Sequence, residues 1–279
     1  MKTPMKIISL SPLVALLGLA LLAPPAPASE LAAAARKIHA AHEDSVIWIS
    51  AVAKTSFSSD GRDSGRNLPD QENKLEALGT IIDASGLVVA ALSSIDPGRI
   101  INARQSSAGS QRVDASSMLK DVKVILADGT EIPAEVVMKD TDLDLAFIRI
   151  KTDSKEAKGV TFKAVDLKDS AKGELLDEVV TVARVDEVFN RVSFVATGEI
   201  NMLTRKPREF LRSGNAVSGC PTFLTNGKLL GITAGRFSKG RGPVPAIIPA
   251  ADVLEIAEQA KAAKPVEAAE PKAAANEGN

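Results

Sequence analysis

The chain has 279 residues, a formal net charge of −1 at neutral pH and 45% hydrophobic residues, with one cysteine and two histidines. This near-neutral balance argues against a nucleic-acid-binding protein, which usually carries a basic face. The single cysteine, Cys220, excludes an intrachain disulfide, and two histidines without a cysteine cluster argue against a transition-metal site. We therefore expect no metal and no other cofactor.

The first 28 residues have the features of an export signal. Lys2 and Lys6 give a positive start, Ile7 to Ala23 form an apolar run, and Ala26-Pro27-Ala28 supplies the small residues of a cleavage site. A retained membrane anchor is the alternative, but it needs about 20 apolar residues and this run is shorter. An exported protein held together without disulfides suits a bacterial periplasm. We expect residues 1–28 to be cleaved and the mature chain to be periplasmic or secreted, with no membrane span.

The first half of the mature chain is predicted to form a helix and about six strands. The helix is Glu30–His42, which has helical composition and no strand alternation. The expected strands are short apolar runs: Ser45–Ala53, Leu78–Asp83, Leu87–Leu92, Val122–Leu126, Ile132–Val137 and Asp144–Ile150. Asp128-Gly129 joins two of them and is favoured in tight hairpin turns. The polar segments Thr55–Asn73 and Asn102–Ser117 are expected to be loops.

The second half repeats this pattern and ends in a helix. The expected elements are strands at Glu178–Val185, Arg191–Thr197, Pro221–Thr225, Lys228–Thr233 and Val244–Ile248, a turn at Asn226-Gly227, and a helix at Ala250–Ala260. Two similar sets of strands indicate two packed antiparallel barrels, at about residues 45–151 and 160–250, followed by a helix over about residues 250–262. Residues 263–279, rich in Ala, Pro, Glu and Lys, are expected to be a disordered tail.

Four segments carry motifs that occur in a fixed order. They are Leu78–Ile95 (LGTIIDASGLVVAALSSI), Val122–Ile150 (VKVILADG…TDLDLAFIRI), Ser218–Thr233 (SGCPTFLTNGKLLGIT) and Pro243–Ile248, the last followed by a helix. Together they resemble the HtrA/Deg group of trypsin-like serine proteases. The resemblance implies that residues 29–262 form one all-β domain, a trypsin-like double antiparallel β-barrel with short N- and C-terminal helices. No PDZ module is expected after it.

The resemblance also implies the positions of a catalytic triad. Ser218, in VSGCP, stands where the family has its nucleophile, and Asp144, in DTDLDLA, stands where it has the aspartate that orients the histidine. Ser93 stands where the family has the histidine itself. A hydroxyl cannot take up the nucleophile's proton near pH 7 and return it to the leaving group, so the triad is expected to be disabled. If the resemblance is set aside, Ser218 is interpreted as a serine in a turn and Asp144 as a carboxylate on the surface.

The loop before the nucleophile position departs from the family as well. The family has G-N-S-G-G, whereas this chain has Ala216-Val217-Ser218-Gly219-Cys220, so two backbone N–H groups aimed at an oxyanion are not assured. An alternative alignment matches Gly214-Asn215-Ala216 to G-N-S and puts Ala216 at the nucleophile. Cys220 is a candidate replacement nucleophile, but a reactive thiol needs a low pKa and a nearby base, so we favour a buried structural thiol.

The loss of the histidine predicts something about the aspartate. A buried, unpaired carboxylate costs on the order of several kcal/mol, so Asp144 is expected either to have a replacement partner or to be exposed. Because serine is shorter than histidine, we also expect a polar gap that admits water between Ser93 and Asp144. Ser93, Asp144 and Ser218 are expected to converge in a groove between the two barrels.

Three functions are compatible with these residues. The first is a pseudoprotease that binds a peptide or an unfolded protein in the old substrate cleft, since addition of an extended peptide as a strand needs no triad. The second is an active serine endopeptidase with an unconventional base, His39 or His42. The third is a purely structural domain. The oligomeric state is not predicted by the sequence.

Overall fold

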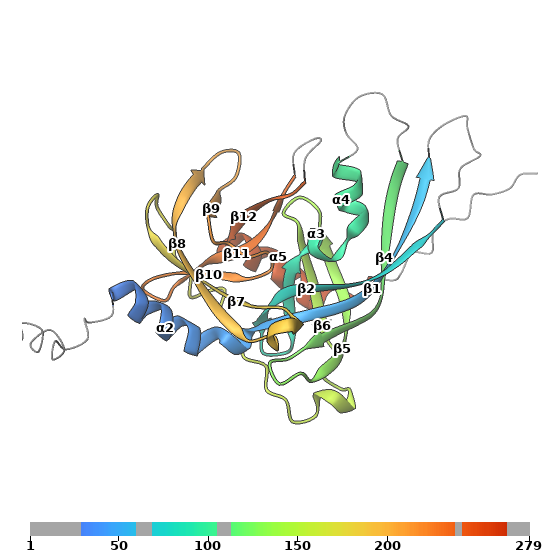
Figure 1. The fold of residues 1–279 in the computed structure, drawn as a ribbon, viewed down its shortest axis with the longest axis horizontal. Helices are drawn as coiled ribbons and strands as arrows, with labels where there is room; N and C mark the ends of the chain where they lie inside the picture. The colour runs from blue at the N-terminus through green and yellow to red at the C-terminus, as the bar shows by residue number, and fades with distance from the viewer. Residues whose placement is uncertain (1–28, 60–68, 105–112, 238–241, 267–279) are drawn as a thin grey trace, which may run out of the picture.

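The computed structural model describes residues 29–59, 69–104, 113–237 and 242–266, so the expected signal peptide and residues 267–279 of the expected tail lie outside it. The described chain forms two closed antiparallel barrels of six strands each, with a few short helices (Figure 1). The predicted all-β, double-barrel fold is confirmed.

Barrel one contains the first six strands. In their order around the barrel they are β1 (Val46–Ser59), β2 (Gln71–Asp83), β3 (Leu87–Ala91), β6 (Leu145–Ile150), β5 (Glu131–Asp140) and β4 (Val113–Ile125). The strands β1, β2 and β4 extend well into segments that were predicted to be loops. Polarity was misleading there because β1 pairs along its length with both β2 and β4, as in the registers Lys54↔Glu72 and Thr55↔Ser117. Backbone pairing therefore decides the structure of these polar residues.

Barrel two has the same architecture. Its order is β10 (Pro221–Leu224), β11 (Leu229–Arg236), β12 (Val244–Pro249), β9 (Phe210–Ser213), β8 (Ser193–Thr204) and β7 (Glu178–Arg184). The strand β9 was not predicted, because four residues are too few to show an alternating pattern. The turn between β7 and β8 contains Asn190 at φ 55°, a left-handed conformation that asparagine tolerates better than most residues.

Helices lie at the ends of the chain and between β3 and β4. They are α2 (Glu30–His42), α3 (Leu92–Ile95), α4 (Pro97–Arg104) and α5 (Ala250–Ala262), with short 3₁₀ turns at Glu43–Ser45, Lys155–Ala157 and Glu187–Phe189. The two terminal helices agree with the prediction, whereas α3 and α4 replace the end of a predicted strand and part of a predicted loop. None of the helices within the described ranges has the length and apolarity needed to cross a membrane.

One apolar core joins the barrels, and each barrel has its own interior. The shared core includes Phe147 of barrel one, Phe223 and Ile232 of barrel two, and Val253 of α5, all of them fully or almost fully buried. Hydrogen bonds also cross between the barrels. The Thr80 hydroxyl donates to the Gly219 carbonyl at 2.7 Å, and the Trp48 indole N–H donates to the Val185 carbonyl at 3.1 Å. The shared core and these two hydrogen bonds therefore link the barrels directly.

Candidate functional site

Asp144 lies at the junction of the two barrels, in the tight turn that precedes β6. Its backbone is left-handed, with φ 60°, and its side chain is completely buried. The Asp140 carboxylate accepts a hydrogen bond from the Leu143 N–H at 2.7 Å, and the Asp144 carbonyl accepts one from Leu92 N–H at 2.7 Å. These bonds hold the turn against the start of α3, so the surface-carboxylate interpretation of Asp144 does not apply.

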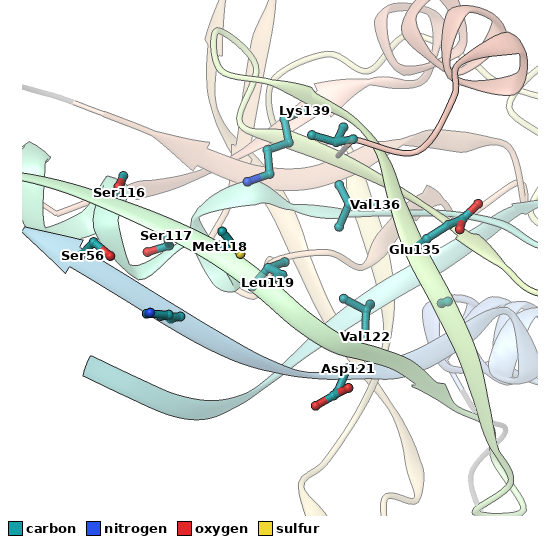
Figure 2. Close-up of a pocket in the computed structure, with 13 residues that line it drawn as sticks. Ser56, Ser116, Ser117, Met118, Leu119, Asp121, Val122, Glu135, Val136 and Lys139 are labelled. Atoms are coloured by element: carbon teal, nitrogen blue, oxygen red, sulfur yellow. The ribbon is translucent and has the colours of Figure 1, made fainter. Parts of the chain in front are cut away.

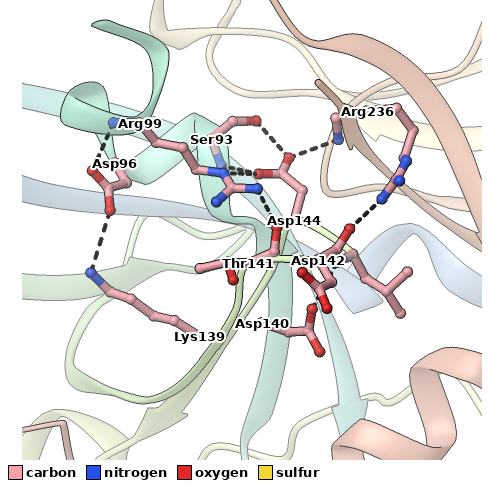
Figure 3. A network of polar contacts seen from close by, with 11 residues as sticks. Ser93, Asp96, Arg99, Lys139, Asp140, Thr141, Asp142, Asp144 and Arg236 are labelled. Carbon is pink, nitrogen blue, oxygen red and sulfur yellow. Dashed lines mark hydrogen bonds and ion pairs between the residues drawn. The ribbon is translucent and has the colours of Figure 1, made fainter. Parts of the chain in front are cut away.

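Four hydrogen bonds satisfy the Asp144 carboxylate (Figure 3). Ser93 supplies two of them, from its N–H to Oδ1 at 2.9 Å and from its hydroxyl to Oδ2 at 2.7 Å. The Gly235 N–H donates to Oδ2 at 2.7 Å, and Arg99 Nε donates to Oδ1 at 3.0 Å. Ser93 is thus in direct contact with Asp144. The expected water-filled gap between Ser93 and Asp144 was wrong, because the chain closes around the carboxylate.

Arg99 is the charged partner of Asp144. It lies on α4, its guanidinium also donates to the Thr141 carbonyl, and its Cζ lies 4.6 Å from the centroid of the Phe237 ring. The sequence predicted either such a partner or an exposed carboxylate, and it did not identify Arg99, which lies outside every motif. The only available signal was a lone basic residue a few positions after Ser93.

The environment of Asp144 affects its ionisation in two opposite ways. Burial raises the pKa of the Asp144 carboxyl above its ordinary value, because the charged form loses its hydration. The hydrogen bonds from Ser93 and Gly235 and the positive charge of Arg99 favour the charged form and oppose this rise. The four donors occupy both oxygens of the Asp144 carboxylate. No acceptor position is left on it for the N–H of an imidazole base.

Gly235 could not be another residue without moving the carboxylate. A Cβ atom there would lie 2.7 Å from Asp144 Oδ2, 2.7 Å from the Pro243 Cβ and 3.0 Å from the Ser93 hydroxyl. These distances are shorter than normal van der Waals contacts. Glycine on β11 therefore allows the backbone of barrel two to approach Asp144 of barrel one closely.

Ser218 lies half-buried in the loop before β10, and its neighbour Gly219 anchors that loop to both barrels. Gly219 has φ 80° and donates its N–H to the Thr233 carbonyl at 2.8 Å, while its carbonyl accepts the Thr80 hydroxyl. A Cβ at Gly219 would lie 2.0 Å from the Leu78 carbonyl oxygen, so only glycine fits. The loop is thus set tightly against the end of β2.

The strand β11 relates Ser218 to Asp144. Thr233 holds the residue after Ser218, and Gly235, two residues along the same strand, holds Asp144. Two residues span about 7 Å in a strand. The hydrogen bonds among the described residues do not join Ser218 to Ser93 or Asp144, so the full convergence of the three residues stays a prediction.

The loop before Ser218 directs one of the expected oxyanion donors elsewhere. If Ser218 is at the nucleophile position, Ala216 is the residue whose N–H would face the oxyanion. That N–H donates to the Ser213 carbonyl at 3.4 Å, and the Val217 carbonyl accepts from the Cys220 N–H at 3.1 Å. These bonds are internal to the loop. In this conformation the Ala216 N–H is directed toward Ser213, within the loop.

The remaining candidate groups lie elsewhere. His39 Nε2 is 2.8 Å from the Ser193 hydroxyl on β8, and the His42 ring stacks on Phe223 with ring centroids 4.4 Å apart. Neither histidine contacts Asp144 or Ser218 in the described structure, so the active endopeptidase with one of them as its base is not favoured. Complete burial raises the pKa of the Cys220 thiol, as expected of a structural cysteine.

Comparisons with known proteins agree with this fold. A model of the trypsin-like peptidase domain matches residues 77–232, more than half of the chain. A probable periplasmic serine endoprotease DegP-like of Bartonella henselae is 31% identical over 144 residues, which are 49% of this chain and 27% of that protein. The chain therefore spans only about a quarter of the length of this relative.

Two solved structures are similar to this chain at low sequence identity. The crystal structure of Deg5 has a TM-score of 0.52 at 18% identity, over 82% of this chain and 94% of that one. The MamO protease domain from Magnetospirillum magneticum, in its apo form, has a TM-score of 0.45 at 16% identity, over 77% and 97% of the two chains. At such low identity the likeness to Deg5 concerns the fold alone.

Proposed function

Because this chain belongs to the trypsin-like peptidase domain family, with an HtrA-type serine protease fold, we propose that it is a catalytically impaired member that binds extended peptides or unfolded protein. In this proposal Ser218 and Asp144 occupy the nucleophile and orienting positions, and Ser93 occupies the position of the base. The peptide lies in the cleft between the barrels.

The observation that carries the proposal is the closed hydrogen-bonding of Asp144. A working triad needs an imidazole that accepts the nucleophile's proton and returns it to the leaving amine. Here Ser93 and Arg99 contact the carboxylate directly, and neither side chain can act as a base near pH 7. Loss of a triad member lowers turnover by roughly 10⁴-fold or more.

The loop of Ala216 supports the same conclusion from a second direction. Transition-state stabilisation in acyl transfer depends on N–H groups that already point at the developing oxyanion. The Ala216 N–H bonds to Ser213 instead. Restoring the base alone would therefore leave the site without one of its two donors.

The name of one relative supports the proposed ligand and location. The Bartonella protein is named as a periplasmic serine endoprotease, so its substrates are polypeptides. In our proposal this chain binds polypeptides but does not hydrolyse them. Together with the export signal expected over residues 1–28, this supports a periplasmic or secreted protein that captures polypeptides.

Two assays on the purified mature chain test the proposal. Hydrolysis of labelled casein should be at background and identical for the wild type and Ser218→Ala. Fluorescence anisotropy with a labelled unfolded-casein peptide should show saturable binding, unchanged in Ser218→Ala and lost in Ser218→Trp, whose indole would fill the cleft beside β11. Hydrolysis that disappears in Ser218→Ala would establish an active peptidase, and absence of peptide binding would leave the structural-domain alternative.

A further inference from the structure

The pairing of β4 with β5, which closes barrel one, is short. The two strands pair over only three residue pairs, from Lys123↔Pro133 to Ile125↔Glu131. Beyond these pairs β4 continues along β1, whereas β5 continues along β6 from Ala134 to Asp140. In the described part of the chain, the side of β5 that faces away from β6 has no strand partner after Pro133. This segment of β5 is a strand edge without a paired strand, which is a template for another strand.

A cavity of about 390 Å³ lies beside this strand edge. Figure 2 shows Leu119 and Val122 of the β4 side and Val136 of β5 lining it, with Lys139 and Glu135 at its margin. The lining combines these apolar side chains with three serines and with charged residues that include Lys54 and Asp121. A peptide that adds to a strand edge uses main-chain hydrogen bonds for affinity and such side-chain pockets for specificity. The β5 edge and this cavity are called the seam site below.

The end of α5 is fixed so that the chain leaves it toward the seam site. The Arg149 guanidinium, on β6, caps the helix by donating to the carbonyls of Ala260, Lys261 and Ala263 at 3.0 to 3.1 Å. Three residues further on, the Val266 N–H donates to the Val136 carbonyl at 2.8 Å, and Val266 lines the cavity. One backbone hydrogen bond of a strand addition is therefore already present.

We propose that the seam site is a second peptide-binding site, distinct from the cleft at Asp144, and that its occupant is the chain's own C-terminal segment from Val266 onward. Thirteen residues follow Val266 in the sequence, and at about 3.3 Å per residue they far exceed the length of the open β5 edge. They include five alanines, small enough for a narrow groove. Pro271 is compatible with an outermost strand, whose outer N–H groups face solvent.

The test supplies the segment in trans. The mature chain is truncated after Lys264, which leaves α5 and its Arg149 cap intact, and a labelled synthetic peptide covering residues 264–279 is titrated against it and against the full-length chain. The peptide should bind the truncated chain at least roughly tenfold more tightly than the full-length chain, in which the site is filled. The same peptide N-methylated at Val266 should lose roughly tenfold in affinity, because it lacks the donor to Val136.

Controls separate this site from nonspecific contact. A peptide with Lys272→Ala should bind like the parent, whereas a scrambled peptide should not bind. In the full-length chain, hydrogen exchange should show a protected Val266 amide. Equal binding of the parent peptide to both chains, equal binding of the N-methylated or scrambled peptide, or a Val266 amide that exchanges at the rate of an unstructured chain would each overturn the proposal. Circular dichroism confirms that the truncated chain is folded before it is titrated.

Discussion

The pairing of Arg99 with Asp144 can be tested by removing its charge. Arg99→Met keeps an unbranched side chain over Phe237 but removes the cation beside a completely buried carboxylate. Breaking a buried ion pair by removing one partner costs about 3–5 kcal/mol. Asp144 keeps its three bonds to Ser93 and Gly235, and the Arg99 side chain is 20% exposed. We therefore expect a loss of about 2 kcal/mol at pH 7, or about 4–8 °C in melting temperature.

This loss should depend on pH in a defined direction. Burial already raises the pKa of Asp144 in the folded state, and removal of the Arg99 charge raises it further. A carboxyl whose folded pKa lies above its unfolded pKa contributes stability at low pH that is lost as the pH rises through the folded pKa. The difference between the variant and the wild type should thus be small near about pH 4 and grow toward pH 7.

Chemical denaturation at several pH values measures both effects. Arg236→Met is the matched control, because Arg236 lies over the Phe210 ring at 4.3 Å and bonds the Asp142 carbonyl without contacting a buried carboxylate. It should cost less than about 1 kcal/mol, at every pH. Equal, pH-independent losses in the two variants would refute the assignment of Arg99 as the partner of Asp144.

Three further changes have defined outcomes. The variant Ser93→His should fold but lose about 1–3 kcal/mol in its free energy of unfolding, because the ring must displace Arg99 from Asp144. Its casein hydrolysis should stay at background, and robust hydrolysis would show that the Ala216 loop can support catalysis. The variant Gly235→Ala should lose about 2 kcal/mol in its free energy of unfolding, because the new Cβ would press on the Asp144 carboxylate. Gly214→Ala is the control: its Cβ would lie 3.8 Å from the nearest atom, Nδ2 of Asn201, so its thermal unfolding should be nearly unchanged. The pKa of Asp83 is lowered from 3.8 to about 2, chiefly by the Ser85 N–H and then by Lys261. Asp83→Asn should therefore cost up to about 1 kcal/mol above pH 4, a value discounted for solvent screening, and the loss should fade as the pH drops toward 2; a penalty that persists in acid would point to packing instead.

The fold was predictable because its signals are local and repeated. The Asp128-Gly129 and Asn226-Gly227 hairpins and the terminal helices follow from turn chemistry and composition, and the structure has them as expected. The extent of β1, β2 and β4 was not predictable, because polar residues such as those of Thr55–Ser59 join a strand only through pairing with distant segments. Short elements such as β9 carry too few residues for a period to appear.

The sequence predicted that a buried Asp144 needs a partner, but it identified only some of the residues that surround this carboxylate. The cost of burying a carboxylate required a partner for Asp144, and the motif positions brought Ser93 to it. Arg99 and Gly235 could not be found in the same way. Their contacts with Asp144 join residues 45 and 91 positions apart in the chain, and no local pattern encodes such distances. The turning of the Ala216 N–H toward Ser213 likewise depends on the loop's own conformation.

The Gly235 contact has a consequence for how the molecule unfolds. The Asp144 carboxylate belongs to barrel one, but one of its four hydrogen bonds comes from the backbone of barrel two. Separation of the barrels would break this hydrogen bond and expose the shared apolar core, so neither half should persist alone as a folded intermediate. The barrels are accordingly not interchangeable modules: a chimera that joins barrel one to a foreign second barrel would need a residue without a side chain at this point of contact.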